Sequence, residues 1–572
     1  MNRLRIKIVG ASGTGLLSTG DILTNALSDL GFYAVSDREF PSVIKGGHSS
    51  YTLNLSTDPI LGLSEQADVM IALDKDGMEK YIHELKDGGI LVHAYERFGG
   101  IKDLMEELAG RNVEVISAPG RKTVTELGGH HVMVNVLLIG MFWKLLGYDY
   151  SLVEEAMKEK FASKPKLLAM DLIILAKGFE LSEKKIDFAL PKKGKVRKFI
   201  NGNRAITLGA IHAGCRAYYA YPMSPASSIL TYMAELVPKT GMIVKQAEDE
   251  ITAAQLAIGS MYMGTRAMTA TSGGGFDLMT ESVSLVGMIE VPFVAVIAQR
   301  PGPATGLPTW TGQGDYQMAK FSGHGEYTRL VLSVSNAQDS FELIQHAFNY
   351  AELYQIPVIV LTEKQIAESL WTVDEFEEGA IPIQRGLVEG KDLDSLESKD
   401  RYRITESGVS KRWIPGSSDK YYFTNGDEHL EDGTLTEDAE PSKAMIAKRI
   451  RKGEALAAAL PEPVIYGEAK ADISFIGWGS SANIMRDIVA QFAAEGVAVN
   501  YLHYTYLFPL KVDTLTQFFA DNKNVHLIEG NYTGQFGQDL EARGHKFAGK
   551  LLKWNGRSIY LEEVTTYINE NL

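Results

Sequence analysis

The sequence predicts a multidomain α/β protein, and three observations support this fold class. The chain has 572 residues, which is more than one hydrophobic core normally supports. Short apolar runs typical of strands alternate with helical segments in two long blocks. In the second block each predicted strand has a helix before and after it, which favours a doubly wound parallel sheet covered on both faces.

The first block, residues 1–185, opens with the strand LRIKIVG and the glycine turn GASGTG, which runs into a helix. Four more strands are expected at SYTLNLS, ADVMIALD, GGILVHA and VEVISAP. The apolar run VMVNVLLIGMFW is shorter than the roughly 20 residues that span a bilayer, so it predicts a buried helix. Helical sequence continues to about residue 180.

The second block covers residues 200–384 and follows a charged linker at 186–199. We expect a helix over IHAGCRAYYA, then strands at GMIVKQA, RAMTATS, VPFVAVIAQ and IPVIVLT with helices between them. Residues 385–465 are polar with little periodicity, which predicts a surface excursion rather than a domain. A last α/β unit is expected at 466–572.

The composition excludes several classes of protein. A net charge of −15 argues against a general nucleic-acid binder, which needs a surplus of basic side chains facing phosphate. The first residues have no apolar signal-peptide core, so we expect a cytoplasmic protein that is neither exported nor bound to a membrane. Cys215 is the single cysteine, whereas an iron–sulfur cluster usually takes about four thiolates. Any redox metal must therefore sit on another chain.

Two glycine-rich segments of the first block are candidate ligand sites. In GASGTG the glycine spacing differs from the G-x-G-x-x-G pattern, and Asp37 is only loosely placed as a ribose ligand. A tight turn and a phosphate at the helix N-terminus are both open interpretations, with NAD the least favoured. Lys45, Gly46 and Gly47 lie between strands, where they indicate either a phosphate or carboxylate site or an exposed hairpin.

Two positions of the second block gather polar groups where predicted elements end. The corner YPMSPASS, residues 221–228, is stiffened by two prolines, and we expect the hydroxyls of Ser224, Ser227 and Ser228 to be free. The segment AEDE, residues 247–250, starts a helix, where carboxylates commonly just complement the helix dipole.

A third position follows the buried strand VPFVAVIA. The loop QRPGPATGLPT, residues 299–309, is stiffened by three prolines and presents Arg300. This guanidinium is suited to clamp a carboxylate with two hydrogen bonds, or it is an ordinary surface ion-pair partner. The carboxyl ends of parallel strands share one edge of a sheet, so the three positions are expected to meet there.

YPMSPASS resembles the YPITPSS signature of the 2-oxoacid:ferredoxin oxidoreductases. AEDEITAAQLAIGS, TATSGGGFDLMTE, QRPGPATGLPTWTGQGD, IVLTEKQIAES, GVSKRWIPG and KAMIAKRIRKGEAL are similar to stretches of the alpha subunit in the same order. Residues 1–185 resemble the gamma subunit, which is fused ahead of alpha in many members, and 466–572 resembles the transketolase C-terminal domain. Ser224 stands where the family usually has threonine, and Gly274 where it has proline.

The resemblance implies thiamine diphosphate-dependent oxidation of a 2-oxoacid to an acyl-CoA. It implies Glu250 as the carboxylate at the cofactor's aminopyrimidine ring, with Ser272 and Gly273 as further cofactor contacts. Ser224, Arg300 and Thr309 are the implied oxoacid ligands. Residues 200–384 would be the pyrimidine-type thiamine domain, and Lys45, Gly46 and Gly47 would contact CoA.

The resemblance also implies a second subunit. The chain has no GDG followed by a downstream asparagine, the usual diphosphate–Mg²⁺ signature of thiamine enzymes. A beta subunit would supply Mg²⁺ and the 4Fe-4S cluster in an (alpha-beta)2 assembly that reduces ferredoxin. Fused gamma–alpha chains favour 2-oxoglutarate, while pyruvate and branched-chain oxoacids stay open. The competing interpretations are a non-catalytic subunit with a decayed thiamine site and an NAD enzyme.

Overall fold

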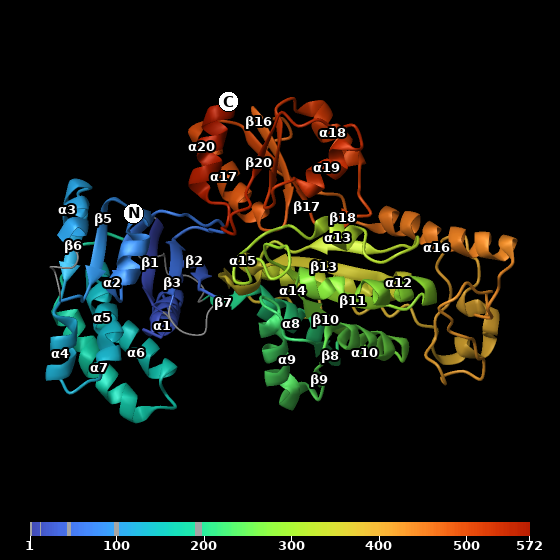
Figure 1. Cartoon of the computed structure of the whole chain (residues 1–572), viewed down its shortest axis with the longest axis horizontal. Coiled ribbons are helices and arrows are strands. Elements are labelled where there is room, and N and C mark those ends of the chain that lie inside the picture. Colours follow the sequence, from blue (N-terminus) through green and yellow to red (C-terminus); the bar gives the residue numbers. More distant parts are fainter. Residues whose placement is uncertain (1–2, 12, 43–46, 97–101, 189–196) are drawn as a thin grey trace. The chain divides into compact units, whose positions relative to one another are not determined.

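The computed structural model describes residues 3–11, 13–42, 47–96, 102–188 and 197–572, which form two compact units (Figure 1). Unit 1 comprises Met1–Ile200 together with Ser369–Glu375 and Tyr560–Glu563. Unit 2 comprises Asn201–Glu368, Phe376–Ile559 and Val564–Leu572. The chain therefore contributes two short, late segments to a unit that is otherwise built from its first 200 residues.

Unit 1 is built on a mixed sheet with the strand order β6-β5-β4-β1-β3-β2-β14-β7. β4, β5 and β6 continue in parallel from β1, whereas β3 is antiparallel to both β1 and β2. The strands are β1 (Arg3–Ala11), β2 (Tyr33–Glu39), β3 (His48–Ser56), β4 (Ala67–Ala72), β5 (Leu85–His93), β6 (Glu114–Ser117), β7 (Lys198–Asn201) and β14 (Leu370–Val373). The helices are α1 (Leu16–Asp29), α2 (Lys75–Tyr81), α3 (Lys102–Gly110), α4 (Gly120–Glu126), α5 (Val134–Leu146), α6 (Tyr150–Lys160) and α7 (Pro165–Glu180).

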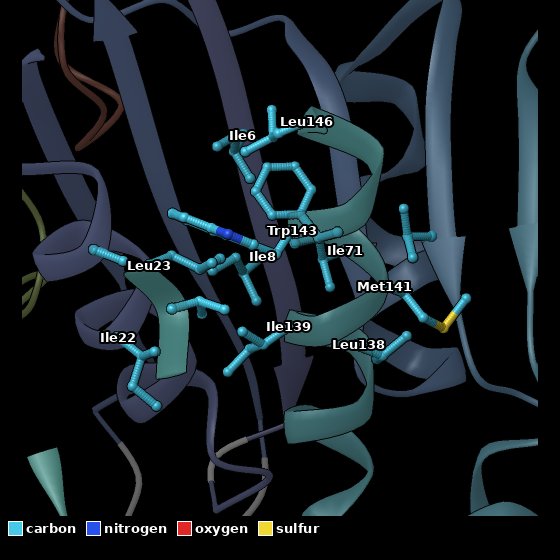
Figure 2. Close-up of a cluster of buried hydrophobic side chains, with 14 of the residues drawn as sticks. Ile6, Ile8, Ile22, Leu23, Ile71, Leu138, Ile139, Met141, Trp143 and Leu146 are labelled. Atoms are coloured by element: carbon cyan, nitrogen blue, oxygen red, sulfur yellow. The ribbon is translucent and has the colours of Figure 1, made fainter. Parts of the chain in front are cut away.

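The core of unit 1 forms where α5 packs on the sheet. Figure 2 shows Ile139, Trp143 and Leu146 of α5 beside Ile6 and Ile8 of β1, and all five side chains are buried. Burying such side chains stabilises a fold by about 1.5 to 3 kcal/mol each. The apolar run at 132–143 is thus a buried helix, as predicted. Across the described ranges we find no helix whose length and apolar character would let it cross a membrane.

The larger sheet of unit 2 has the order β18-β12-β13-β11-β10-β8-β9, and all of its strands except β18 run parallel. The predicted parallel, doubly wound sheet is confirmed. Its strands are β8 (Ala217–Ala220), β9 (Ile243–Gln246), β10 (Ala267–Thr271), β11 (Phe293–Gln299), β12 (Leu330–Ser333), β13 (Pro357–Glu363) and β18 (Tyr506–Phe508). Its helices are α8 (Gly202–His212), α9 (Ser227–Thr240), α10 (Glu250–Tyr262), α11 (Gly273–Asp277), α12 (Thr280–Ile289), α13 (Tyr316–Lys320), α14 (Ala337–Tyr354) and α15 (Lys364–Glu368).

A second sheet of unit 2, the C-terminal sheet, has the order β15-β17-β16-β19-β20. β16, β17, β19 and β20 are parallel and β15 is antiparallel at the edge. The strands are β15 (Val464–Tyr466), β16 (Ile473–Trp478), β17 (Val499–Tyr504), β19 (Val525–Glu529) and β20 (Gly549–Leu552). The helices of this part of the chain are α17 (Ser481–Glu495), α18 (Asp513–Asp521), α19 (Gln535–Glu541) and α20 (Leu561–Asn571).

The helix predicted over IHAGCRAYYA, residues 211–220, is wrong beyond His212. α8 ends at His212, Gly214 adopts φ +81°, and Ala217–Ala220 form the fully buried strand β8. A glycine in the left-handed region terminates a helix readily. The corner at 221–228 therefore follows the carboxyl end of a strand rather than a helix.

The excursion between the two sheets of unit 2 contains a helix that the low periodicity did not predict. α16 (Ala439–Ala459) lies within it, and its Lys448 and Lys452 are buried. Both ammonium groups form ion pairs with the buried carboxylate of Glu290 at the end of α12, with 2.6 Å between Lys448 Nζ and Glu290 Oε1. These cations hold the pKa of Glu290 well below its usual range despite its burial. Breaking such a buried pair costs about 3 to 5 kcal/mol, so α16 is firmly attached to the sheet domain.

Candidate active site

Four segments that carry predicted site residues follow neighbouring parallel strands of the larger sheet. The corner 221–228 follows β8, Glu250 comes after β9, Ser272 follows β10, and Arg300 follows β11. β9, β8, β10 and β11 are adjacent in this order and parallel, so the four segments leave the same edge of the sheet. This is the edge at which open parallel sheets bind ligands.

Two hydrogen bonds connect the corner at 221–228 to the segments that follow β10 and β11. The Nη1 of Arg300 donates a hydrogen bond of 2.7 Å to the carbonyl oxygen of Ser224. The hydroxyl of Ser272 lies 2.7 Å from the sulfur of Met223 and donates to it. Met223 and Ser224 of the corner therefore bind side chains from the segments that follow β10 and β11.

The hydroxyls of the corner are not all free, contrary to the expectation. Ser228 Oγ accepts a hydrogen bond of 2.7 Å from the side-chain amide of Asn203, which also donates to the carbonyl of Pro225. Ser227 is the first residue of α9, while Ser224 is exposed. Ser224 is therefore the corner serine best placed to meet a ligand.

The three acidic residues of AEDE have different surroundings. Asp249 caps α10, because its Oδ1 accepts from the backbone N–H of Thr252 at 2.7 Å. Glu248 is exposed and its Oε1 accepts from the hydroxyl of Thr252 at 3.2 Å. Glu250 is only 3% exposed, and its Oε1 is buried with no hydrogen-bond partner within the described ranges. Since Asp249 satisfies the helix terminus, Glu250 is not required as a cap.

The glycines after β10 leave room for two carboxyl groups. A Cβ atom added at Gly275 would lie 2.7 Å from Glu250 Oε1, and one added at Gly273 would lie 2.6 Å from Asp315 Oδ2. Neither position tolerates a side chain without displacement of the carboxylate. Main chain at the start of α11 therefore approaches both Glu250 and Asp315 closely.

Asp315 is a site residue that the sequence analysis missed. Its Oδ2 is buried without a hydrogen-bond partner in the part of the chain that the structure describes. Burial raises the pKa of Asp315 to about 7, the neighbouring Asp277 adds to this effect, and Arg300 opposes it. The only signal in the sequence is the GQGD that follows the proline loop, which does not show whether its carboxylate is buried.

The loop after β11 combines an accessible cation with a buried hydroxyl residue. Partial burial lowers the pKa of Arg300 from its ordinary value and Asp315 opposes that shift, so the guanidinium stays charged at neutral pH. Thr309 is 6% exposed, farther along the same loop. The arrangement offers a cation, an exposed serine and two carboxyl groups, each with one buried oxygen that has no hydrogen-bond partner among the described residues. Such groups suit binding and proton transfer on a small anionic substrate.

Of the three candidate CoA residues in unit 1, the structure describes only Gly47. Lys45 and Gly46 lie outside the described residues, and Gly47 is exposed with φ +78° before β3.

In the turn before α1, Gly13 and Gly15 adopt φ values of +93° and +86°. Both conformations suit the tight turn that was one open interpretation of GASGTG. Asp37 lies on β2 and accepts a hydrogen bond of 3.2 Å from the hydroxyl of Ser369.

The described residues offer a candidate contact for a cofactor ring but no cluster of metal ligands. The described stretches contain no group of three or more His, Cys, Asp or Glu side chains that would hold a metal ion. The unpartnered, buried oxygen of Glu250 is, in contrast, the kind of atom that a bound polar ring would satisfy.

Comparisons with known proteins assign the family. Residues 208–434 match the family model described as pyruvate flavodoxin/ferredoxin oxidoreductase, thiamine diphosphate-binding, and residues 5–181 match that of pyruvate ferredoxin/flavodoxin oxidoreductase. A 2-oxoacid:ferredoxin oxidoreductase subunit alpha from Sulfolobus sp. is 31% identical over 98% of this chain and 96% of its own length. This chain belongs to the 2-oxoacid:ferredoxin oxidoreductase alpha-subunit family. The resemblance noted in the motifs is thereby confirmed.

Two further relatives agree with this assignment. The alpha subunit of 2-oxoacid:ferredoxin oxidoreductase 1 from Sulfurisphaera tokodaii is 30% identical over 98% of this chain and 96% of its own length. A solved 2-oxoglutarate:ferredoxin oxidoreductase from Magnetococcus marinus, with 2-oxoglutarate, coenzyme A and succinyl-CoA bound, is 29% identical. It covers 100% of both chains with a TM-score of 0.93. The chain is thus a subunit of an oxidoreductase that acts on 2-oxoacids, and its fold is multidomain α/β with a thiamine diphosphate-binding domain.

Proposed function

We propose that this chain is the catalytic alpha subunit of an enzyme that oxidises 2-oxoglutarate to an acyl-CoA and passes the electrons to ferredoxin. The observation that carries the proposal lies at one sheet edge. Arg300 is bonded to the Ser224 carbonyl there, and Glu250 has a buried Oε1 without a hydrogen-bond partner among the described residues. The choice of 2-oxoglutarate is supported by the Magnetococcus marinus structure and by the 2-oxoglutarate synthase subunit KorA of Archaeoglobus fulgidus, which is 31% identical over 62% of this chain.

The residues present fit thiamine diphosphate on the pyrimidine side. Glu250 Oε1 has no hydrogen-bond partner among the described residues, and it occupies space that a side chain at position 275 would fill. Ser272 and Gly273, both buried at the start of α11, are proposed to line the same space. When bound, the thiamine supplies the carbon nucleophile and electron sink that decarboxylation requires. Glu250 would hold a proton toward the bound aminopyrimidine ring and so act in general acid–base catalysis.

The oxoacid would be bound by the loop after β11. Arginine has five N–H donors, so a single bond from Arg300 to the Ser224 carbonyl leaves capacity for a substrate carboxylate. The exposed Ser224 hydroxyl and Thr309 are proposed to orient the 2-oxo group and the carboxylate. Because proline-stiffened segments hold these groups, little conformational entropy is lost when the substrate binds.

A beta subunit is proposed to complete the site. Several large apolar side chains on segments that follow the strand ends are exposed, namely Tyr221, Leu278, Leu307 and Phe321. Exposed apolar groups around a site suit a protein interface. The partner would supply the diphosphate–Mg²⁺ site and the 4Fe-4S cluster in an (alpha-beta)2 complex. Lys45, Gly46 and Gly47 of this chain are proposed to contact CoA. The domain boundaries at 185, 199, 384 and 465 also remain predictions.

We expect the isolated chain to bind no iron and to oxidise no 2-oxoacid. Cys215 is the single cysteine in the sequence and is buried, so the chain lacks the thiolates of a cluster. Iron analysis and ferredoxin or viologen reduction on the purified chain, before and after addition of the beta subunit, measure this. Stoichiometric iron on the single chain would contradict the partner proposal.

The reconstituted complex is expected to turn over 2-oxoglutarate with a higher kcat/KM than pyruvate or 2-oxoisovalerate. The three substrates share the 2-oxo and carboxylate groups and differ in the distal part, so their comparison isolates recognition of the second carboxylate. Reduction of viologen in the presence of CoA is the measurement. A higher kcat/KM for pyruvate or 2-oxoisovalerate would reassign the substrate while leaving the reaction class intact.

A further inference from the structure

Gln313 is a buried residue whose side chain joins three separated parts of unit 2. It is 1% exposed, and it lies in the loop between Arg300 and α13. Its Nε2 donates to Glu363 Oε1 at 3.0 Å and to the carbonyl of Trp478 at 3.1 Å. Its Oε1 accepts from the backbone N–H of Gly530 at 2.7 Å. Glu363 ends β13, and Trp478 and Gly530 lie at the carboxyl ends of β16 and β19.

The main chain of Gln313 is bound by the same C-terminal strand ends. Its N–H donates to the carbonyl of Gly530 at 2.8 Å, and its carbonyl accepts from Asn531 Nδ2 at 2.9 Å. A Cβ atom added at Gly479 would lie 2.6 Å from Gln313 Nε2, so a glycine is needed to leave this space. All four hydrogen-bonding groups of Gln313 are thus engaged by the C-terminal sheet.

The residues next to Gln313 in sequence also contact the C-terminal part of the chain. The guanidinium of Arg557 lies over the ring of Trp310, 3.2 Å from its centre. The backbone N–H of Thr311 donates to the carbonyl of Gly556 at 3.2 Å. Gln535 Nε2 donates to the carbonyl of Gly314 at 2.7 Å. Four of the five residues from 310 to 314 therefore contact the C-terminal part of the chain along a continuous stretch.

We propose that the C-terminal sheet positions the oxoacid-binding loop, residues 300–315, and that Gln313 is the positioning residue through which it acts. This inference rests on the proposed function of Arg300 and Thr309. At the loop's start Arg300 donates a hydrogen bond to Ser224, while the middle, Gly302–Leu307, is exposed and is closed by the hydrogen bond of 2.9 Å from the Leu307 N–H to the Pro301 carbonyl. The anchor at 310–314 therefore fixes where Thr309 lies and limits how far Arg300 can move.

Positioning of this kind acts on substrate binding and reaction geometry rather than on the cofactor. Displacing a reacting or binding group by about 1 Å costs on the order of 100-fold in rate. Glu250 starts α10, and within the described ranges its buried Oε1 accepts no hydrogen bond from residues 310–314, so we expect its proton chemistry to be independent of Gln313. Activation of the thiamine ring and recognition of the oxoacid are consequently separable in this chain.

The test compares Gln313→Ala with Gln538→Ala. Gln538 is an exposed glutamine of α19 that hydrogen-bonds to Gln317 at 3.0 Å, so it is a control for loss of an amide without loss of the anchor. Hydrogen–deuterium exchange on the full chain is expected to rise for residues 300–315 in Gln313→Ala only. In the alpha–beta complex, kcat/KM for the oxoacid should fall about tenfold or more, whereas exchange of the thiamine C2 proton should keep its wild-type rate.

Arg557→Ala replaces Gln313→Ala if that variant does not fold. It removes the contact over Trp310 at a half-exposed position. We expect it to raise hydrogen–deuterium exchange of residues 300–315 and to lower kcat/KM, each by a smaller factor than Gln313→Ala. Wild-type kcat/KM in variants whose loop exchanges faster would overturn the inference, as would wild-type exchange of the loop. A wild-type complex that oxidises none of the oxoacids would instead refute the proposed function, and the exchange experiment would still decide whether Gln313 anchors the loop.

Discussion

Arg300→Ala is expected to lower kcat/KM for the oxoacid about 10- to 1,000-fold, which corresponds to about 1.5 to 4 kcal/mol of lost transition-state binding. The guanidinium follows β11 at the ligand-binding edge, and burial together with Asp315 affects its pKa without removing its charge. Its loss would remove the proposed charge-assisted hydrogen bonds to the substrate carboxylate and also removes the 2.7 Å bond to the Ser224 carbonyl. Steady-state kinetics of the reconstituted complex measure the effect.

Arg216→Ala is the matched control for this substitution. Arg216 also donates to main-chain carbonyls, at 2.8 Å to Cys215 and 3.2 Å to Ile211, but it directly precedes β8 and so lies at the opposite end of the strands. We expect its kcat/KM to stay within about twofold of the wild type, because surface substitutions seldom exceed about 0.5 kcal/mol. An unchanged kcat/KM in Arg300→Ala for every oxoacid tried would show that the loop has a structural role and does not bind the substrate.

The parallel sheet and the convergence of its strand ends could be predicted because local patterns determine them. VPFVAVIAQ and IPVIVLT are continuous apolar runs, and they form the buried, adjacent strands β11 and β13. Once strands alternate with helices, the carboxyl ends must share an edge. AEDE and the proline loop were therefore located relative to one another without any knowledge of side-chain contacts, whereas the strand before the corner, β8, was predicted as a helix.

Other features depend on partners that are remote in sequence. Tyr506–Phe508 adds an antiparallel strand to β12, a pairing that no local pattern announces. In α16 the buried face carries Lys448 and Lys452, whose burial is possible only because Glu290 neutralises them, so the helix lacks an apolar stripe. A hydrophobic period cannot reveal such a helix.

Asp315 and Gln313 show the same limit within the site. Each is one polar residue in a loop, and its importance arises from what surrounds it. The carboxyl of Asp315 becomes notable because burial raises its pKa, and Gln313 because Gly530 and Asn531 come from the far end of the chain. Sequence patterns identify residue types that suit a chemistry, while burial and pairing identify which of them are committed to it.

The second large effect is expected for Glu250→Gln, which should slow exchange of the thiamine C2 proton and oxoacid turnover at least about tenfold, and as much as about 10⁴-fold. A carboxylic acid can hold a proton at the pyrimidine nitrogen that faces it and shift it as the ring changes its bonding, whereas an amide of the same shape cannot. The structure separates this role from dipole complementation, because Asp249 caps α10 and Glu250 Oε1 is buried without a partner among the described residues.

Stability provides an independent criterion for the same variant. A buried carboxylate that lacks a hydrogen-bond partner costs folding free energy, so the neutral amide should leave the Tm of the isolated chain unchanged or raise it. Glu248→Gln is the matched control, since Glu248 is two residues away, exposed, and accepts a hydrogen bond of 3.2 Å from the hydroxyl of Thr252. It should change neither Tm nor C2 exchange. Wild-type C2 exchange in Glu250→Gln would show that Glu250 is merely a helix-start charge, and the proton would then have to be held by Glu248 or by a group on the partner subunit.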